Sequence, residues 1–188
     1  MSDVKILAIS GSLRAASHNT RLLRAAQKFA PGGMDIEIYE GLREIPPYDL
    51  DQDNANDRPA AVAELRRRIT EADGLLIATP EFNYSIPGVL KNAIDWVSTD
   101  WSRTEGLPLL HKPAAIMGAA PTNFGSVRAQ LALRQVFVWT HTDVVVRPEL
   151  IAFRSHERFD DAGNLTDEDT IGLLRDLLAA LAEKIDGK

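Results

Sequence analysis

Hydroxyl, amide and guanidinium side chains crowd into one short stretch near the start of the chain, residues 9–20. This stretch directly follows an apolar run, and its polar members are Ser10, Ser12, Arg14, Ser17, Asn19 and Thr20. A phosphate dianion needs such donors, together with backbone N–H groups near the start of a helix. A helix cap would account for Ser17 or Asn19 alone, but not for the whole donor set with its arginine. The spacing therefore predicts an anion site in this first loop.

Two common phosphate-binding motifs are absent from the sequence. A P-loop needs Gly-Lys-Ser/Thr, which occurs nowhere, and the dinucleotide fingerprint needs three glycines where this loop has only Gly11. We therefore expect the first loop to hold a terminal monophosphate, and not a bridging pyrophosphate.

The second polar loop, residues 79–88, combines aromatic and polar side chains between two prolines. Pro80 and Pro87 fix backbone angles at its two ends. Between them stand two rings and three polar groups: Phe82, Tyr84, Glu81, Asn83 and Ser85. A flat heteroaromatic ligand needs such a platform with fixed polar groups beside it. The residues alone leave open the alternative that both rings plug the core and that Glu81 is solvated.

Apolar segments and helical patterns alternate along the chain and position these loops. The strand segments are nearly continuous in apolar residues, as in a parallel sheet covered on both faces, and lie at residues 5–9, 35–39, 74–79, 113–118 and 142–146. The helical patterns lie at residues 19–30, 59–72, 87–97, 127–139 and 167–185. This alternation predicts a doubly wound α/β domain that spans residues 1–188.

The carboxyl ends of parallel strands share one edge of a sheet, and such folds bind their ligands there. The first loop, the second loop and a third loop at residues 118–128 should therefore meet at that edge. Two longer irregular stretches, residues 41–58 and 153–166, are too polar for the core. The residues leave open whether these stretches are functional or idle surface loops.

Composition narrows the class of protein. The chain has 188 residues and a formal net charge of −6, so it has no basic field to attract nucleic acid or an anionic membrane. It has no cysteine, no apolar run long enough to cross a bilayer and no signal-peptide pattern, which predicts a cytoplasmic protein. The four histidines lack metal-ligand spacing, so we expect no metal site. Any redox chemistry must then come from a cofactor.

Two motifs resemble those of the NADPH-dependent FMN reductase family. "GSLRAASHNTRLLRAA" is similar to its G-S-x-R-x-x-S-x-N pattern, and "TPEFNYSIPGVLKNAIDWVS" to its T-P-E-Y-N-x-S-x-P-G-x-L-K-N-A-I-D-W signature. The likeness continues through "GSVRAQLALRQVF" and "RPEL", and within the family it favours bacterial quinone and chromate reductases and azoreductases. The resemblance implies a flavodoxin-like fold, with five parallel strands in the order 2-1-3-4-5 and FMN at the carboxyl edge.

The resemblance also implies which residues bind the cofactor. The FMN phosphate and nearby ribityl oxygens would be held by residues of the first loop: Ser12, Arg14, Ser17 and Asn19, with Thr20 beside them. The isoalloxazine ring would be lined, mainly through backbone groups, by Pro80, Glu81, Phe82 and Asn83, with Tyr84 near the ring or the acceptor pocket. Ala119 and Ala120 would contact its pyrimidine side. The sequence departs from the family pattern at Phe82, where a tyrosine is usual, and in the third loop, which lacks the usual serines and paired glycine.

The implied activity is that of an NAD(P)H-dependent FMN oxidoreductase. NADPH or NADH would reduce FMN in a ping-pong cycle, and a small-molecule acceptor would then take two electrons: a quinone, an azo compound or an oxidised metal ion. No side chain need act as acid or base, because solvent can protonate a reduced quinone. A flavodoxin-type electron carrier between protein partners is the alternative, and a ligand-free binding module is the least favoured. The moderate charge and the "TPEFN" loop favour the enzyme.

The helix at residues 127–139 is apolar on more than one face. Either it is buried within its own subunit or it forms a subunit interface, as the resemblance also implies. We favour the interface and therefore a homodimer or homotetramer. Trp96 and Trp101 could then cover the flavin of the neighbouring subunit.

Overall fold

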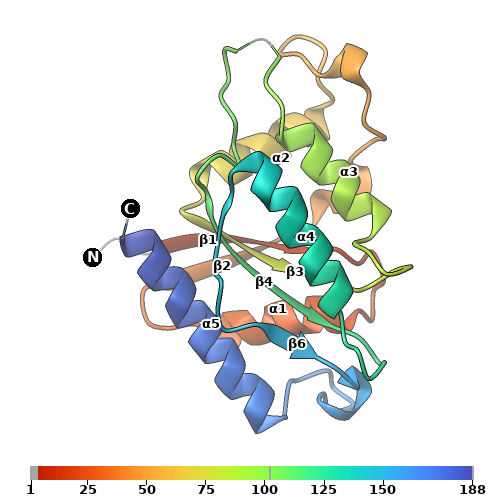
Figure 1. Ribbon diagram of the computed structural model, residues 1–188, viewed down its shortest axis with the longest axis vertical. Helices are drawn as coiled ribbons and strands as arrows, with labels where there is room; N and C mark the ends of the chain where they lie inside the picture. The colour runs from red at the N-terminus through yellow and green to blue at the C-terminus, as the bar shows by residue number, and fades with distance from the viewer. Residues whose placement is uncertain (1–3, 102, 188) are drawn as a thin grey trace.

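A parallel sheet forms the middle layer of the protein (Figure 1). The computed structural model describes residues 4–101 and 103–187. The strands run in the order β2-β1-β3-β4-β5, with β6 also paired to β4, and every pairing is parallel. Their bounds are β1 Val4–Ser10, β2 Met34–Tyr39, β3 Gly74–Ala78, β4 Pro113–Ala119, β5 Asp143–Val144 and β6 Leu150–Ala152. The predicted order 2-1-3-4-5 is confirmed.

The fifth position of the sheet is divided between two short strands. The sequence predicted one strand at residues 142–146, but β5 covers only Asp143–Val144 and pairs with the start of β4. The chain then leaves the sheet and returns as β6, which pairs with the end of β4. Pro148 lies between the two strands and has no backbone N–H to donate to a neighbouring strand. The prediction was therefore wrong in the extent of this strand, and it missed β6.

Within the described residues, five α-helices cover the two faces of the sheet. Figure 1 shows α1 (His18–Phe29) and α5 (Glu168–Asp186) together on one side. Their apolar stripes pack on strand residues such as Ala8 and Leu76. The opposite face is covered by α2 (Ala60–Glu71), α3 (Gly88–Val97) and α4 (Val127–Thr140). Because neighbouring residues of a strand point to opposite faces, each buried strand serves both layers, which explains its continuous apolar sequence. All five predicted helices are confirmed.

None of the helices in the described ranges is long and apolar enough to cross a bilayer. Short 3₁₀ turns occur in the two long polar stretches, at Gly41–Glu44, Leu50–Gln52 and Ser155–Glu157.

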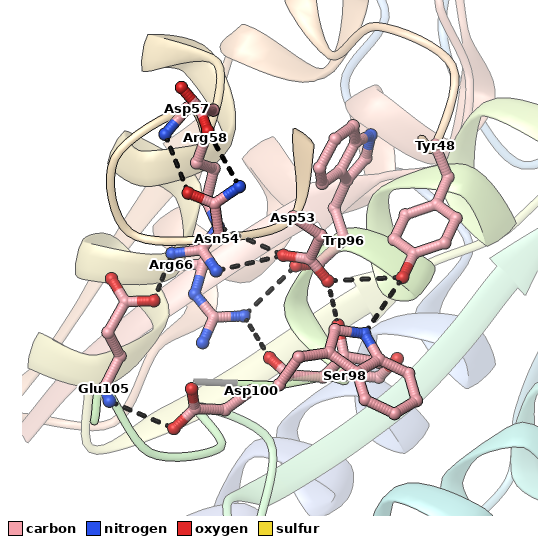
Figure 2. Close-up of polar contacts among 12 residues, drawn as sticks. Tyr48, Asp53, Asn54, Asp57, Arg58, Arg66, Trp96, Ser98, Asp100 and Glu105 are labelled. Carbon is pink, nitrogen blue, oxygen red and sulfur yellow. Dashed lines mark hydrogen bonds and ion pairs between the residues drawn. The ribbon is translucent and has the colours of Figure 1, made fainter. Parts of the chain in front are cut away.

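The first long stretch, residues 41–58, is fastened to the chain after α3 by a buried carboxylate. Figure 2 shows Asp53 at the centre of this contact. Asp53 accepts hydrogen bonds from Arg58 Nη2 at 3.0 Å and from the Tyr48 hydroxyl at 3.2 Å, and also from the Thr99 hydroxyl. The Asp53 side chain is fully buried and that of Arg58 is 3% exposed, so the pair is shielded from water. Arg58 also pairs with Glu105.

A second buried arginine, Arg66, also binds the chain that follows α3. Arg66 of α2 donates to three backbone carbonyls beyond or at the end of α3: Trp96 at 3.1 Å, Thr99 at 2.8 Å and Gly106 at 3.0 Å. Burial lowers the pKa of Arg66. Trp96 is itself fully buried, and its indole N–H donates to the Pro46 carbonyl at 2.8 Å. The expectation that Trp96 covers a neighbouring flavin is therefore wrong, whereas Trp101 is exposed.

We predict that Asp53→Asn strongly destabilises the fold. The change leaves the Arg58 guanidinium buried without its full charge partner, and removing one member of a buried pair costs about 3 kcal/mol of unfolding free energy. Urea denaturation measures the effect. Asp51→Asn, an exposed change on the same loop, is the matched control and should stay within about 0.5 kcal/mol of the parent protein. Equal denaturation midpoints for the two variants would contradict the prediction.

Candidate cofactor-binding site

The three loops meet at the carboxyl edge of the sheet, as the sequence predicted. The backbone ties them together: Gly11 N donates to Ala78 O at 2.8 Å, and Thr79 N to Met117 O at 2.9 Å. A Cβ at Gly118 would overlap the Thr79 carbonyl and the Ser126 side chain. A Cβ at Gly11 would lie 3.2 Å from the Pro80 ring. Glycine at these two positions therefore lets the loops approach one another closely.

The first loop keeps several donors free. Leu13, Ala15 and Ala16 donate no backbone hydrogen bond to any part of the chain that the structure describes. The Arg14 guanidinium is exposed and likewise has no acceptor within the described ranges. The hydroxyls of Ser10 and Thr20 share a 2.9 Å hydrogen bond. A hollow of about 300 Å³ lies beside this loop, and its polar lining includes Ser10, Ser12, Arg14 and Thr20.

Two predicted phosphate ligands have protein partners in this structure. Ser17 caps α1, and its hydroxyl accepts from the backbone N–H groups of Asn19 and Thr20 at 3.2 and 3.4 Å. The buried Asn19 amide donates to Ala119 O at 3.0 Å and accepts from Ala119 N at 2.9 Å. These contacts give Ser17 and Asn19 a structural role, and their contact with a phosphate stays a prediction.

His18, next to the cap, joins the first loop to the segment after β6. Its Nδ1 lies 2.6 Å from the Ser155 hydroxyl, and its ring stacks on Phe159 with the centroids 5.3 Å apart. Burial lowers the pKa of His18, and the positive charges of Arg21 and Arg14 lower it further. The imidazole is therefore neutral at neutral pH and adds no charge beside the anion loop. The sequence offered no signal for this contact, because Ser155 is 137 residues away.

The second loop presents its rings to solvent on a tight turn. Phe82 and Ser85 exchange two backbone hydrogen bonds of 3.0 Å. The two residues between them, Asn83 and Tyr84, have φ values of 50° and 67°, as a type I′ turn requires. Phe82 is 55% exposed and Tyr84 is 73% exposed. The alternative that these rings plug the core is therefore wrong.

Glu81 fastens the second loop to the third. Its Oε2 accepts from the backbone N–H groups of Arg128 and Ala129, at 2.9 and 3.4 Å, so it caps α4 from outside that helix. Its other oxygen pairs with the Arg128 guanidinium, and this hydrogen bond raises the pKa of Arg128. The guanidinium lies 3.8 Å from the centre of the Tyr84 ring and 5.0 Å from that of Phe124. The Glu81 side chain is only 8% exposed, so the alternative that it is solvated is wrong. Sequence reasoning missed both Arg128 and Phe124.

The third loop takes part in the candidate site mainly through its backbone groups. Ala119 and Ala120 are buried, and the backbone of Ala120 donates to Ala152 O at 3.1 Å and accepts from Ser155 N at 3.0 Å. Asn19 also bonds the Ala119 backbone, so both residues have protein partners, and their contact with the flavin stays a prediction. Pro80 is buried at the start of the second loop.

The edge therefore offers two kinds of surface side by side. Free amides, hydroxyls and Arg14 suit a phosphate monoester, and the exposed rings of the second loop suit a flat apolar ring. This donor set fits FMN, which carries both groups. Within the described ranges, no group of three or more His, Asp or Glu side chains could hold a metal ion.

We predict that His18 makes the FMN-free protein sensitive to mild acid. Its pKa in the folded state lies below the ordinary value of 6.5, so the unfolded chain takes up the proton first as the pH falls. Its contribution is complete above about pH 6.5 and is lost toward the lower folded-state pKa. The unfolding free energy should therefore drop more steeply between about pH 7 and 5 in the parent protein than in His18→Gln. Urea denaturation across this range measures it, and parallel pH curves would overturn the prediction.

Comparison with known proteins agrees with this geometry. The chain matches the NADPH-dependent FMN reductase family over residues 4–157. It is 44% identical over 179 residues to an NAD(P)H-dependent FMN reductase of Pseudomonas aeruginosa, covering 95% of this chain and 94% of that protein. It is 36% identical over 183 residues to the quinone reductase of Escherichia coli K12, covering 97% and 95%. The solved structure of FerB, a flavoenzyme NAD(P)H:(acceptor) oxidoreductase from Paracoccus denitrificans, matches with a TM-score of 0.87 at 31% identity, covering 98% of each chain. The chain therefore belongs to the NADPH-dependent FMN reductase family, and it is an oxidoreductase that works with FMN and NAD(P)H.

Proposed function

We propose that this chain acts as a quinone reductase, with residues 1–188 forming a single FMN-binding domain. FMN held by the first and second loops would supply the hydride chemistry of the reaction, a ping-pong transfer of two electrons from NAD(P)H to the acceptor. The observation that carries the proposal is the exposed ring pair, Phe82 and Tyr84, held at the same edge as the loop with free amides. The relative named a quinone reductase supports quinones as acceptors, and we extend the proposal to azo compounds and oxidised metal ions.

The residues around the cofactor divide into binding and positioning groups. Ser12, Arg14, Thr20 and the free amides of the first loop would hold the phosphate, while Ser17 and Asn19 fix the loop that presents them. The flavin ring would lie against backbone and side chains of the second and third loops: Pro80, Glu81, Phe82, Asn83, Ala119 and Ala120. Tyr84, braced by Arg128, would form a wall of the acceptor pocket. We assign no side chain as acid or base, because solvent protonates a reduced quinone.

The same proposal places the enzyme in the cytoplasm, with small molecules as its partners and neither nucleic acid nor membrane among them. The net charge of −6 supports this, because a basic surface is the usual requirement for binding either polyanion.

We predict that the purified protein retains added FMN on a desalting column and that anaerobic NADPH rapidly bleaches its visible absorbance. Arg14→Gln should weaken FMN binding at least tenfold, because a hydrogen bond to a charged group contributes roughly 1.5–3 kcal/mol. Arg147→Gln, an exposed arginine on the chain between β5 and β6, is the matched control. Bound flavin that NADPH cannot bleach would favour the electron carrier. Failure to retain flavin would refute the site.

The exposed face of α4 supports a homodimer, or a homotetramer built from such dimers. Leu131, Val138 and Trp139 are 55%, 76% and 83% exposed on this helix, although large apolar side chains are usually covered. The helix begins at Val127, between Phe124 of the third loop and Arg128, both of which lie beside the candidate site. A second copy of the chain against α4 would therefore border the flavin, as in an isologous dimer.

We predict that Val138→Glu converts the protein into a monomer, because a charge at the centre of an apolar interface is not solvated. Light scattering coupled to size-exclusion chromatography measures the mass. Leu173→Glu places the same charge at an exposed leucine of α5 and should leave the oligomer intact. A monomeric parent protein would exclude the interface.

A further inference from the structure

A second hollow flanks the first loop, on the side of α1 that faces residues 162–165. Its volume is about 410 Å³, within the range of small-molecule sites. We call it the basic groove, because the charged side chains that line it are Arg21, Arg24 and Lys28 and no acidic side chain lines it. The remaining lining is small, apolar or amide: Ala15, Ala16, Ala25, Phe29, Ala162, Gly163, Asn164 and Leu165.

The three cations come from one face of one helix. Arg21, Arg24 and Lys28 are spaced by three and four residues, which brings their side chains together along α1. None of them pairs with a carboxylate anywhere in the described ranges, in a chain whose acids outnumber its Lys and Arg by 27 to 21. Elsewhere arginines such as Arg67 and Arg68 have acidic partners. Like charges clustered without acids repel one another, so this groove is poised to accept an anion.

The far wall of the groove is shaped to receive Arg21. Gly163 has a φ of +86°, and a Cβ there would lie 2.9 Å from Arg21 Nε, so the side chain packs directly on the glycine backbone. The turn that carries Gly163 is held by Asp160, which accepts from Asn164 N at 2.7 Å and Asn164 Nδ2 at 2.9 Å. Within the described residues Asp160 thus bonds its own turn and forms no ion pair with the three cations.

The floor of the groove adds an apolar surface. The Phe29 ring lies there, with Lys28 Nζ 5.3 Å and the Arg175 guanidinium 5.1 Å from its centre. Guanidinium groups bind phosphate oxygens through paired donors, and lysine adds a point charge. We propose that the basic groove binds a small phosphorylated molecule, at a site separate from that of FMN. Ala15 and Arg24 line both the groove and the hollow beside the first loop, so the two sites share a wall.

Isothermal titration of the FMN-saturated protein with inorganic pyrophosphate tests this proposal. FMN occupies the first loop, so the expected result is saturable binding with one site per chain. The double variant Arg21→Gln/Lys28→Gln should weaken this binding at least tenfold, since both side chains line the groove and neither lines the hollow beside the first loop. The control Lys5→Gln/Arg147→Gln removes the same charge from exposed cations elsewhere and should leave the affinity unchanged.

Three outcomes would overturn the proposal. They are the absence of saturable binding, binding that appears only in protein without FMN, and equal weakening in the two double variants. The second outcome would assign pyrophosphate to the first loop. The readout is heat of binding and not catalysis, so the result stands apart from the identity of the electron acceptor.

Discussion

The two hydrogen bonds between the Asn19 amide and the backbone of Ala119 hold the carboxyl edge of the sheet together. They join the start of α1 to the end of β4 across 100 residues of sequence, and both lie in the core, where an unpaired partner costs about 1–3 kcal/mol. With α1 fixed in this way, Ser17 caps the helix and His18 reaches Ser155, which in turn bonds Ala120. These contacts fix the position of the first loop, and its remaining backbone N–H groups are free to bind a ligand.

A different polar contact fixes the second loop at the same edge of the sheet. Asn83 and Tyr84 both have positive φ, a conformation that costs a bulky residue energy and that persists only where the surroundings enforce it. The Phe82–Ser85 hydrogen bonds enforce it from within the turn, and Arg128 stacks on the Tyr84 ring from outside. Glu81 holds Arg128 and the first turn of α4 at once. The rings are thus exposed and yet fixed, which is what a preorganised stacking surface requires.

The features that could be predicted from the sequence are those that depend on patterns between nearby residues. Strand order, helix positions and the meeting of three loops follow from apolar periodicity and from the rule that parallel strands share a carboxyl edge. The break between β5 and β6 was not predicted, because a strand of three residues is too short to show a periodic pattern. Pro148 marks the interruption in the sequence. The roles of Glu81 and His18 were not predicted for another reason. Each depends on a partner 47 or 137 residues away, and no local spacing specifies which distant backbone group a buried side chain will reach.

The two helices that cover one face of the sheet, α1 and α5, differ in the charge of their first turns. The start of α5 carries Asp167 as its cap, followed by Glu168 and Asp169, which suits the positive end of a helix dipole. The first turn of α1 has no acidic residue, and Arg14 and Arg21 flank it instead. An anion at that end would satisfy the free amides and the unpaired cations together. A ligand that binds only the folded state adds stability in proportion to the logarithm of its concentration over its Kd. Occupancy of the first loop should therefore govern the stability of α1 and of every loop that Asn19, Ser17 and His18 connect to it.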